Sequence, residues 1–386
     1  MFLLLLICAA SVFGYYDSDD FIDFLIHSNQ FRARLNALGF KLEANNVHVT
    51  AGFRNPTAGK IFNNIYSSTS YEQNNYETVN FIPKVIAAIG YKIPNIFGIG
   101  LGYEFSYNSS EYQVHSPIIT SVAYNDNFRI SIPVHIGIGS KNKDGQIGIS
   151  TAIEARYYLN LPFMSNIRLY IKYGEFNEKG KLGSTFQNSK KSSIGLATRI
   201  YFRVETEDVL IEPIIRLQYD QALESDVDGV KSFGNYYDIT AFNQGKYSTG
   251  LDYKDNPTDD LGLIFRQGWA IENPYRIGVA LPVGFTAGND YFSVYLEPSV
   301  SFNVINGSRI YKSNQNNSDL VTLRPDAFYI VGYFVYGEFY LKPSKSLEWY
   351  TEIQTGGTST LASLQKSSFS EFVLNASTGI TWYFNL

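Results

Sequence analysis

Cysteine and charge are both scarce in this sequence. Its 386 residues contain a single cysteine, Cys8, so there is no disulfide framework and no candidate for thiolate chemistry elsewhere in the chain. Charged residues make up 17%, below the roughly 25% typical of soluble domains, and the net charge is only -5. No long run of Lys or Arg occurs. We therefore expect no nucleic-acid partner, because a phosphate backbone needs a concentrated basic surface.

Histidine is equally sparse, which limits metal and catalytic chemistry. The four histidines are His27, His48, His115 and His135, and none has metal-ligand spacing with cysteine or another histidine. We expect no metal, no cofactor and no catalytic residue. A barrel enzyme with a Ser-His pair stays open as a rival, although no spacing points to one. The Asp-rich loop at about 223–272 holds no twelve-residue calcium loop, which favours a solvated loop.

Long apolar runs are missing beyond the first residues. Residues 1–14 are predicted to be a signal peptide, with an apolar core at Phe2–Ala10 and small residues near Gly14, although no basic residue opens the segment. The alternative is a short anchor helix, which at about a dozen residues is too short to span roughly 30 Å of hydrocarbon. Since no other stretch approaches eighteen apolar residues, a membrane-spanning chain of this kind must cross as a barrel.

What the sequence does contain is strict two-residue alternation. Residues 97–105, 128–138 and 147–159 each place their large apolar side chains on one face and glycine, polar or charged residues on the other. Runs of 9 to 11 residues suit a tilted membrane barrel, whereas soluble strands average five or six. The alternative is a soluble β-sandwich, which would tolerate charge on both faces. We predict an all-β fold, a closed antiparallel transmembrane β-barrel of about 14 strands with a short N-terminal helix.

Loop lengths indicate the topology. The expected strands are 46–54, 78–91, 97–108, 117–124, 128–139, 146–159, 166–174, 192–204, 209–222, 275–286, 291–304, 329–342, 346–355 and 371–386. Long connections alternate with short ones, as in outer-membrane barrels with short periplasmic turns and long outside loops. Before them, a helical stripe predicts a helix at about Ser18–Leu38. The expected domains are therefore 1–14, a periplasmic or lumen-plugging helix segment at 15–45, and the barrel at 46–386.

Ionisable residues within the strands fall on the face opposite the apolar one, where they are predicted to line the lumen. They are Lys84, Glu104, Arg129, Glu154, Arg156, Arg168, Lys172, Arg199, Arg203, Glu212, Arg216, Arg276, Glu297, Glu338, Glu348 and Glu352. Bases dominate from Arg129 to Arg276 and acids from Glu297 to Glu352, which suggests two facing walls and a transverse field. The rival interpretation is that these charges pair between strands and fill the interior. Trp382, Phe384 and Leu386 are predicted to form an aromatic girdle and insertion signal at the C-terminus.

Several segments resemble a known family. They are residues 20–25 with His27, Asn29, Gln30 and 32–34, and also 128–134, 273–279, 347–350 and 378–383. In these stretches the chain resembles the variable surface protein family of intestinal spirochaetes. The resemblance implies an abundant, antigenically variable outer-membrane protein that is oligomeric, and it implies no catalytic residues. The insert at about 224–272 and the start of the signal segment depart from the family pattern.

These observations favour one function and leave two alternatives open. We expect a surface-exposed outer-membrane barrel with variable loops at the cell surface, and passage of small solutes as a second activity. An adhesin that binds host surface ligands through its Tyr- and Asn-rich loops is the alternative, with a barrel enzyme third. The expected partners are outer-membrane lipid, the barrel-insertion machinery, further copies of the chain and host surface ligands.

Overall fold

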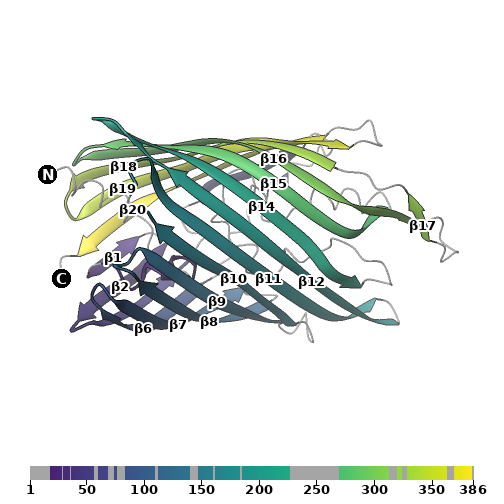
Figure 1. Ribbon diagram of the computed structural model, residues 1–386, viewed down its shortest axis with the longest axis horizontal. Coiled ribbons are helices and arrows are strands. Elements are labelled where there is room, and N and C mark those ends of the chain that lie inside the picture. Colours follow the sequence, from purple (N-terminus) through teal and green to yellow (C-terminus); the bar gives the residue numbers. More distant parts are fainter. Residues whose placement is uncertain are drawn as a thin grey trace.

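The computed structural model describes residues 18–27, 29–34, 36–55, 60–67, 74–75, 83–108, 112–139, 147–159, 161–182, 185–226, 269–312, 320–323, 328–362 and 369–384. In these ranges the chain forms a closed antiparallel barrel of sixteen strands (Figure 1). The predicted all-β barrel is confirmed. No helix among these residues is long and apolar enough to cross a membrane.

Each barrel strand pairs with the next barrel strand along the chain. The sixteen are β1 (Gln30–Arg34), β2 (Ala37–Ala44), β3 (Val47–Arg54), β6 (Lys84–Ile93), β7 (Phe97–Asn108), β8 (Tyr112–Ala123), β9 (Phe128–Gly139), β10 (Ile147–Tyr158), β11 (Met164–Leu182), β12 (Thr185–Phe202), β14 (Val209–Asp226), β15 (Trp269–Gly288), β16 (Phe292–Lys312), β18 (Phe328–Ser344), β19 (Leu347–Ala362) and β20 (Phe369–Phe384). Four short strands extend this sheet: β4 (Lys60–Ser67), β5 (Asn74–Asn75), β13 (Val204–Glu205) and β17 (Leu320–Leu323).

The barrel closes through an unusual seam. β20 pairs with β1 at one end, where Phe384 lies opposite Phe31, and with β4 further along, where Glu371 lies opposite Ser67. The rings of Phe31 and Phe384 lie 4.7 Å apart across the join. Because β1 has only five residues, β4 supplies the pairing that β1 cannot reach. The first and last strands thus meet, which leaves no open edge over most of the sheet.

The two ends of the barrel differ as predicted. Short turns and the outer ends of β1 and β20 lie at one end, called here the short-turn end. In the β2–β3 turn, Asn45 and Asn46 have φ of 48° and 68°, the left-handed pair that a tight hairpin requires. The strand ends at Arg54, Gly139, Asp226 and Lys312 lie at the other end, called here the long-loop end. An even number of strands returns the chain to the end at which it began.

Two predictions about the N-terminal region are wrong in detail. The structure has a 3-10 helix, η1 (Ser18–Asp23), where a helix to Leu38 was expected, and the following residues form β1 and β2. These two strands raise the count from fourteen to sixteen and start the barrel at Gln30, before the expected boundary at 46. The helical periodicity of this segment gave the wrong prediction because strand pairing across the seam outweighs local periodicity. Leu38 accordingly lies on the outer face, where it is 49% exposed, and Ala37 beside it is buried.

Strand length varies around the barrel. β6–β10 have 10 to 12 residues, whereas β11, β12 and β14–β16 have 18 to 21, and the longer strands form a taller wall (Figure 1). At about 3.3 Å per residue and a tilt of about 40°, a strand the length of β16 reaches roughly 50 Å along the barrel axis. A hydrocarbon layer is only about 30 Å thick, so this wall extends about 20 Å beyond it.

Candidate functional site: the barrel lumen

The two faces of the sheet differ sharply in chemistry. Leu101 and Ile89 on the outer face are each 57% exposed, while Glu104 on the inner face of β7 is 0% exposed. The alternation is continuous along β6, where Lys84, Ile86, Ala88 and Gly90 are buried between exposed neighbours. Outward side chains are therefore mainly apolar, and the polar and ionisable ones turn inward, as a barrel in lipid requires.

Ten of the predicted lumen residues are buried within the closed sheet: Lys84, Glu104, Glu154, Lys172, Arg199, Arg216, Arg276, Glu297, Glu338 and Glu348. Arg129, Arg156, Arg168, Glu212 and Glu352 are on the same inner face and partly exposed. Arg203 differs, because it lies past the end of β12 and pairs with the exposed Glu205 at the short-turn end, 3.0 Å away. Trp382 and Phe384 face outward at this end with rings 5.7 Å apart, and Leu386 lies outside the described residues.

Five arginines on adjacent strands stand directly opposite one another. The pairing register places Arg129 opposite Arg156, Arg156 opposite Arg168, Arg168 opposite Arg199, and Arg199 opposite Arg216. This row, called here the arginine ladder, crosses β9, β10, β11, β12 and β14. Arg129 is the second residue of β9, whereas Arg216 lies seven residues beyond Val209 at the start of β14. The ladder therefore climbs from the short-turn mouth into the lumen.

Tyrosine rings support the ladder. The guanidinium of Arg129 lies 3.9 Å from the ring centre of Tyr158, and that of Arg168 lies 4.4 Å from Tyr201. Arg199 lies 4.8 Å from the ring of Tyr170. Stacking of this kind holds a guanidinium flat and fixes the direction of its N–H groups. The side chains are thus oriented toward fixed positions in the lumen.

Acidic residues are concentrated on β16, β18 and β19, where their carboxylates accept hydrogen bonds mainly from tyrosines. Tyr336 and Tyr340 each donate a hydrogen bond to Glu338, over 2.5 and 2.8 Å. Bases also reach this wall: Arg34 pairs with Glu352 at 2.9 Å, and Lys342 with Glu348 at 3.5 Å. The separation of charge predicted from the sequence is accordingly partial, since cross-strand pairing also occurs.

Pairing on the basic wall is strongest at Asp220. This carboxylate accepts two hydrogen bonds from Arg276, at 2.9 and 2.6 Å, and a third from Gln218 at 2.6 Å. Arg216 lies 3.5 Å from Glu297 on the far side of β15. Hence part of the charge is neutralised within the wall, as the rival interpretation of the sequence proposed.

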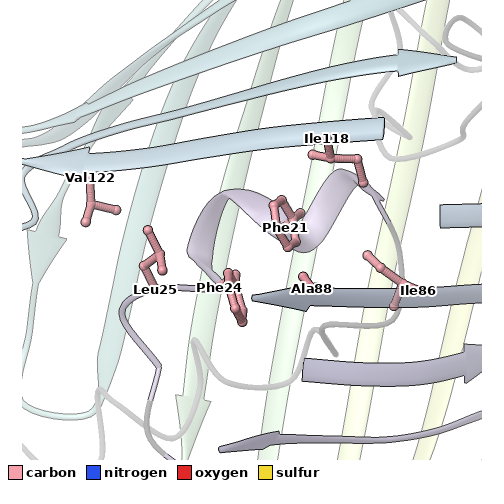
Figure 2. Packing of buried hydrophobic residues seen from close by; sticks show 7 residues of the cluster. All are labelled: Phe21, Phe24, Leu25, Ile86, Ala88, Ile118 and Val122. Carbon is pink, nitrogen blue, oxygen red and sulfur yellow. The ribbon is translucent and has the colours of Figure 1, made fainter. Parts of the chain in front are cut away.

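The segment from 18 to 27, called here the plug, lies against the inner wall. Phe21, Phe24 and Leu25 are at most 2% exposed and pack with Ile86, Ala88, Ile118 and Val122 from β6 and β8 (Figure 2). The rings of Phe21 and Phe24 stack with their centres 5.0 Å apart. In an otherwise polar interior, this is a buried apolar contact that holds the plug on one sector of the wall.

Glycines on β7 make room for the plug. A Cβ built on Gly102 would lie 2.8 Å from the Phe21 ring, and one on Gly100 would lie 3.1 Å from the Phe24 ring. Any larger residue at either position would push the rings off the wall. The run Gly98, Gly100, Gly102 is visible in the sequence, and inward glycines at two-residue spacing are a signal for something packed inside.

Asp23 joins the plug to the ladder. Its two oxygens accept hydrogen bonds from the Nη1 atoms of Arg129 and Arg156, each over 2.8 Å. Arg156 also donates to Glu154 over 2.6 Å. Sequence analysis missed Asp23 as a lumen residue, because its role depends on where the chain folds back and not on a strand pattern.

The pKa of Asp23 is lowered. Burial acts to raise it, but the charges of Arg156 and Arg129 and the hydrogen bond from Arg129 outweigh burial. A carboxyl with a depressed folded pKa contributes stability that is complete above its ordinary pKa of about 4, and this stability is lost as pH falls through the folded value.

We therefore expect plug docking to be independent of pH from neutrality to about pH 4 and to weaken below it. Hydrogen exchange of the Phe24 and Ile26 amides, which bond within the plug, would follow this change. The variant Asp23→Asn is the control for the other carboxyl groups, because its plug should not show the weakening below about pH 4 that Asp23 causes. An identical acid profile in both proteins would contradict the assignment.

A serine and a histidine do meet inside the barrel. Ser116 Oγ lies 2.7 Å from His135 Nδ1, and both residues are at most 1% exposed. Glu104 stands in register beside Ser116, on the side away from His135. In a hydrolase triad the acid orients the histidine, whereas here the carboxylate in register stands beside the serine. His48 is likewise buried on the inner face, whereas His115 lies beside Tyr103 on the outer face.

Several solved structures of outer-membrane proteins are similar to this chain at low sequence identity. Similar solved structures include a bacterial polysaccharide outer membrane secretin, 11% identical with a TM-score of 0.45, over 93% of this chain and 99% of that chain. An OmpT loop L8 deletion mutant, an outer membrane protein of Vibrio cholerae, is 11% identical with a TM-score of 0.34, over 92% and 97% of the two chains. No curated protein sequence matches the chain significantly.

The remaining comparison concerns the sequence itself. A family model described as the Serpulina hyodysenteriae variable surface protein matches residues 1–383. The match extends over almost the whole sequence and confirms the resemblance seen in its separate segments. The chain belongs to the variable surface protein family of Serpulina hyodysenteriae.

Proposed function

We propose that this protein is a surface-exposed outer-membrane barrel whose lumen passes small polar solutes. The observation that carries the proposal is closure by sixteen strands around a polar interior. Barrels of eight strands are filled by side chains, whereas those of sixteen to eighteen leave an aqueous channel. The sequence-based count of fourteen fell between these limits, so the two added strands favour a channel.

The orientation in the membrane follows from the two ends. In outer-membrane barrels short turns face the periplasm and long loops face outward. We therefore assign the short-turn end to the periplasm, which agrees with export by a signal peptide at 1–14. The tall wall of β11, β12 and β14–β16 supports surface exposure, since it extends beyond the thickness of the hydrocarbon layer. Residues 1–14 and most of the long loops lie outside the described residues.

The plug covers one sector of the lumen. Its described partners belong to β3 and β6–β10, including an edge-on contact between Phe24 and His48. β11–β20 form the rest of the circumference. In this uncovered part, the upper ladder on β11, β12 and β14 and the acidic residues of β16, β18 and β19 lie in neighbouring sectors of the wall, on either side of β15.

Planar-bilayer recording with purified protein tests the proposal. Discrete conductance steps are expected, because each barrel that inserts adds one open channel to the membrane. Protein boiled before addition is the control, and a gel comparing boiled and unboiled samples verifies folding, since a folded barrel migrates differently until heated. Folded protein that inserts without conductance would rule out an open channel. Adhesion through the long loops stays a prediction.

A further inference from the structure

We infer that the arginine ladder, with Arg168 at its centre, is a binding track for small oxyanions that carry a carboxylate or a phosphate. The inference rests on the proposed passage of solutes and adds their chemical class. It is based on the register of five like charges, on the distribution of their counter-charges, and on the geometry at Arg168.

The five arginines of the ladder repel one another. Like charges directly opposite on neighbouring strands destabilise a sheet, and here four successive strand pairs bring arginine against arginine. Arginine keeps its charge at any physiological pH, so the repulsion cannot be relieved by losing a proton. Anions close to the ladder would therefore stabilise it.

The close contacts between carboxylates of the protein and the ladder are at its two ends. Asp23 and Glu154 contact Arg129 and Arg156 at the short-turn end, and Glu297 lies 3.5 Å from Arg216 at the upper end. Among the described residues, no ion pair joins the central Arg168 to a carboxylate. Its described contacts are one bond from Nε to Asn166 Oδ1 at 3.1 Å and the ring of Tyr201.

This geometry suits an oxyanion. Asn166 accepts a hydrogen bond from Nε, and Tyr201 covers one face of the guanidinium, so neither partner engages the two terminal amino groups by a hydrogen bond. Two N–H groups of one arginine bind a carboxylate or phosphate in a bidentate manner. Arg156 and Arg199 stand on either side in register and add positive potential at the same place. Asp23, Glu154 and Glu212 act on Arg168 through space, but none of them is in direct contact with it in the described part of the chain. An incoming oxyanion would therefore find a guanidinium that no carboxylate pairs with directly.

The ladder also has the shape of a track. Neighbouring strands lie about 4.8 Å apart, so four steps cover about 19 Å. Since barrel strands tilt by about 40°, a row at right angles to them rises about 12 Å along the axis. Asp23 already binds the lowest pair of arginines as an oxyanion would, which shows that this chemistry fits the ladder.

Bilayer recordings across a KCl gradient test the inference. We expect the reversal potential to lie closer to the equilibrium potential of chloride than to that of potassium. Added inorganic phosphate should inhibit the chloride current, and acetate should inhibit it more weakly. Arg168→Gln should raise the phosphate concentration for half inhibition at least tenfold. Arg203→Gln, which removes an arginine at the short-turn end outside the ladder, should leave it unchanged. A preference for acetate would assign the track to carboxylates instead of phosphates.

The outcomes separate this inference from the proposed function. Conductance without phosphate inhibition, or with equal inhibition of the wild type and Arg168→Gln, would overturn the ladder and leave the channel standing. If no conductance appears, broadening of the phosphorus-31 NMR line of inorganic phosphate by the protein in detergent still decides. Broadening that is lost in Arg168→Gln supports the ladder, and its absence in the wild type refutes it. Should Arg168→Gln fail to fold, Arg168→Lys keeps the charge without the bidentate fork and should still weaken phosphate inhibition.

Discussion

The substitution Leu101→Arg is expected to lower the free energy of unfolding in lipid vesicles by about 2–4 kcal/mol. Leu101 is the fifth residue of β7 and is 57% exposed on the outer face, close to the middle of the membrane-spanning part of its strand. An arginine there meets hydrocarbon and must bend toward the interface to keep its charge hydrated. Urea unfolding of protein inserted in vesicles measures the change.

Leu101→Ala is the matched control, because it removes the same apolar side chain and adds no charge. We expect it to cost distinctly less than Leu101→Arg, since most of the penalty belongs to the guanidinium. Equal losses for the two variants would mean that position 101 does not face lipid. The outer face would then need another explanation, such as a buried contact between copies of the chain.

Alternation made the wall of this barrel predictable from sequence. The two-residue period of 128–138 becomes β9, and its inward Arg129 and His135 fall on the face assigned to them. A strand in lipid is under a constraint that acts at every position, so a single sequence records it repeatedly. The same constraint explains why turns and long connections could be assigned to opposite ends from the sequence.

Register and the N-terminal region could not be predicted in this way. Whether Arg168 lies opposite Arg199 or beside it depends on turn geometry and bulges, such as the irregularity between Met164 and Asn166. Residues of β1 carry a stripe that also fits a helix, and only pairing with β20 decides between the two. The contact of Asp23 with Arg129 joins residues 106 positions apart, and no local pattern encodes it.

A second large effect is expected at Asp23. The substitution Asp23→Asn keeps the size of the side chain and leaves Arg129 and Arg156 without their shared carboxylate. Breaking a fully buried pair costs about 3–5 kcal/mol. The Asp23 side chain is 22% exposed, so we expect roughly half of that, about 2 kcal/mol, as lost docking energy of the plug. Each 1.4 kcal/mol is a factor of ten, so the Phe24 and Ile26 amides should exchange about thirtyfold faster.

Glu205→Gln gives a matched comparison, because it breaks another arginine–carboxylate pair at the same end of the barrel. Arg203 and Glu205 are 31% and 51% exposed, and such surface pairs contribute at most about 1 kcal/mol. Exchange in the plug should therefore be unchanged in Glu205→Gln and faster in Asp23→Asn. Unchanged exchange in both variants would show that the apolar contacts of Phe21, Phe24 and Leu25 hold the plug without the ion pairs. Asp23 would then act as a counter-charge for the ladder and not as the anchor of the plug.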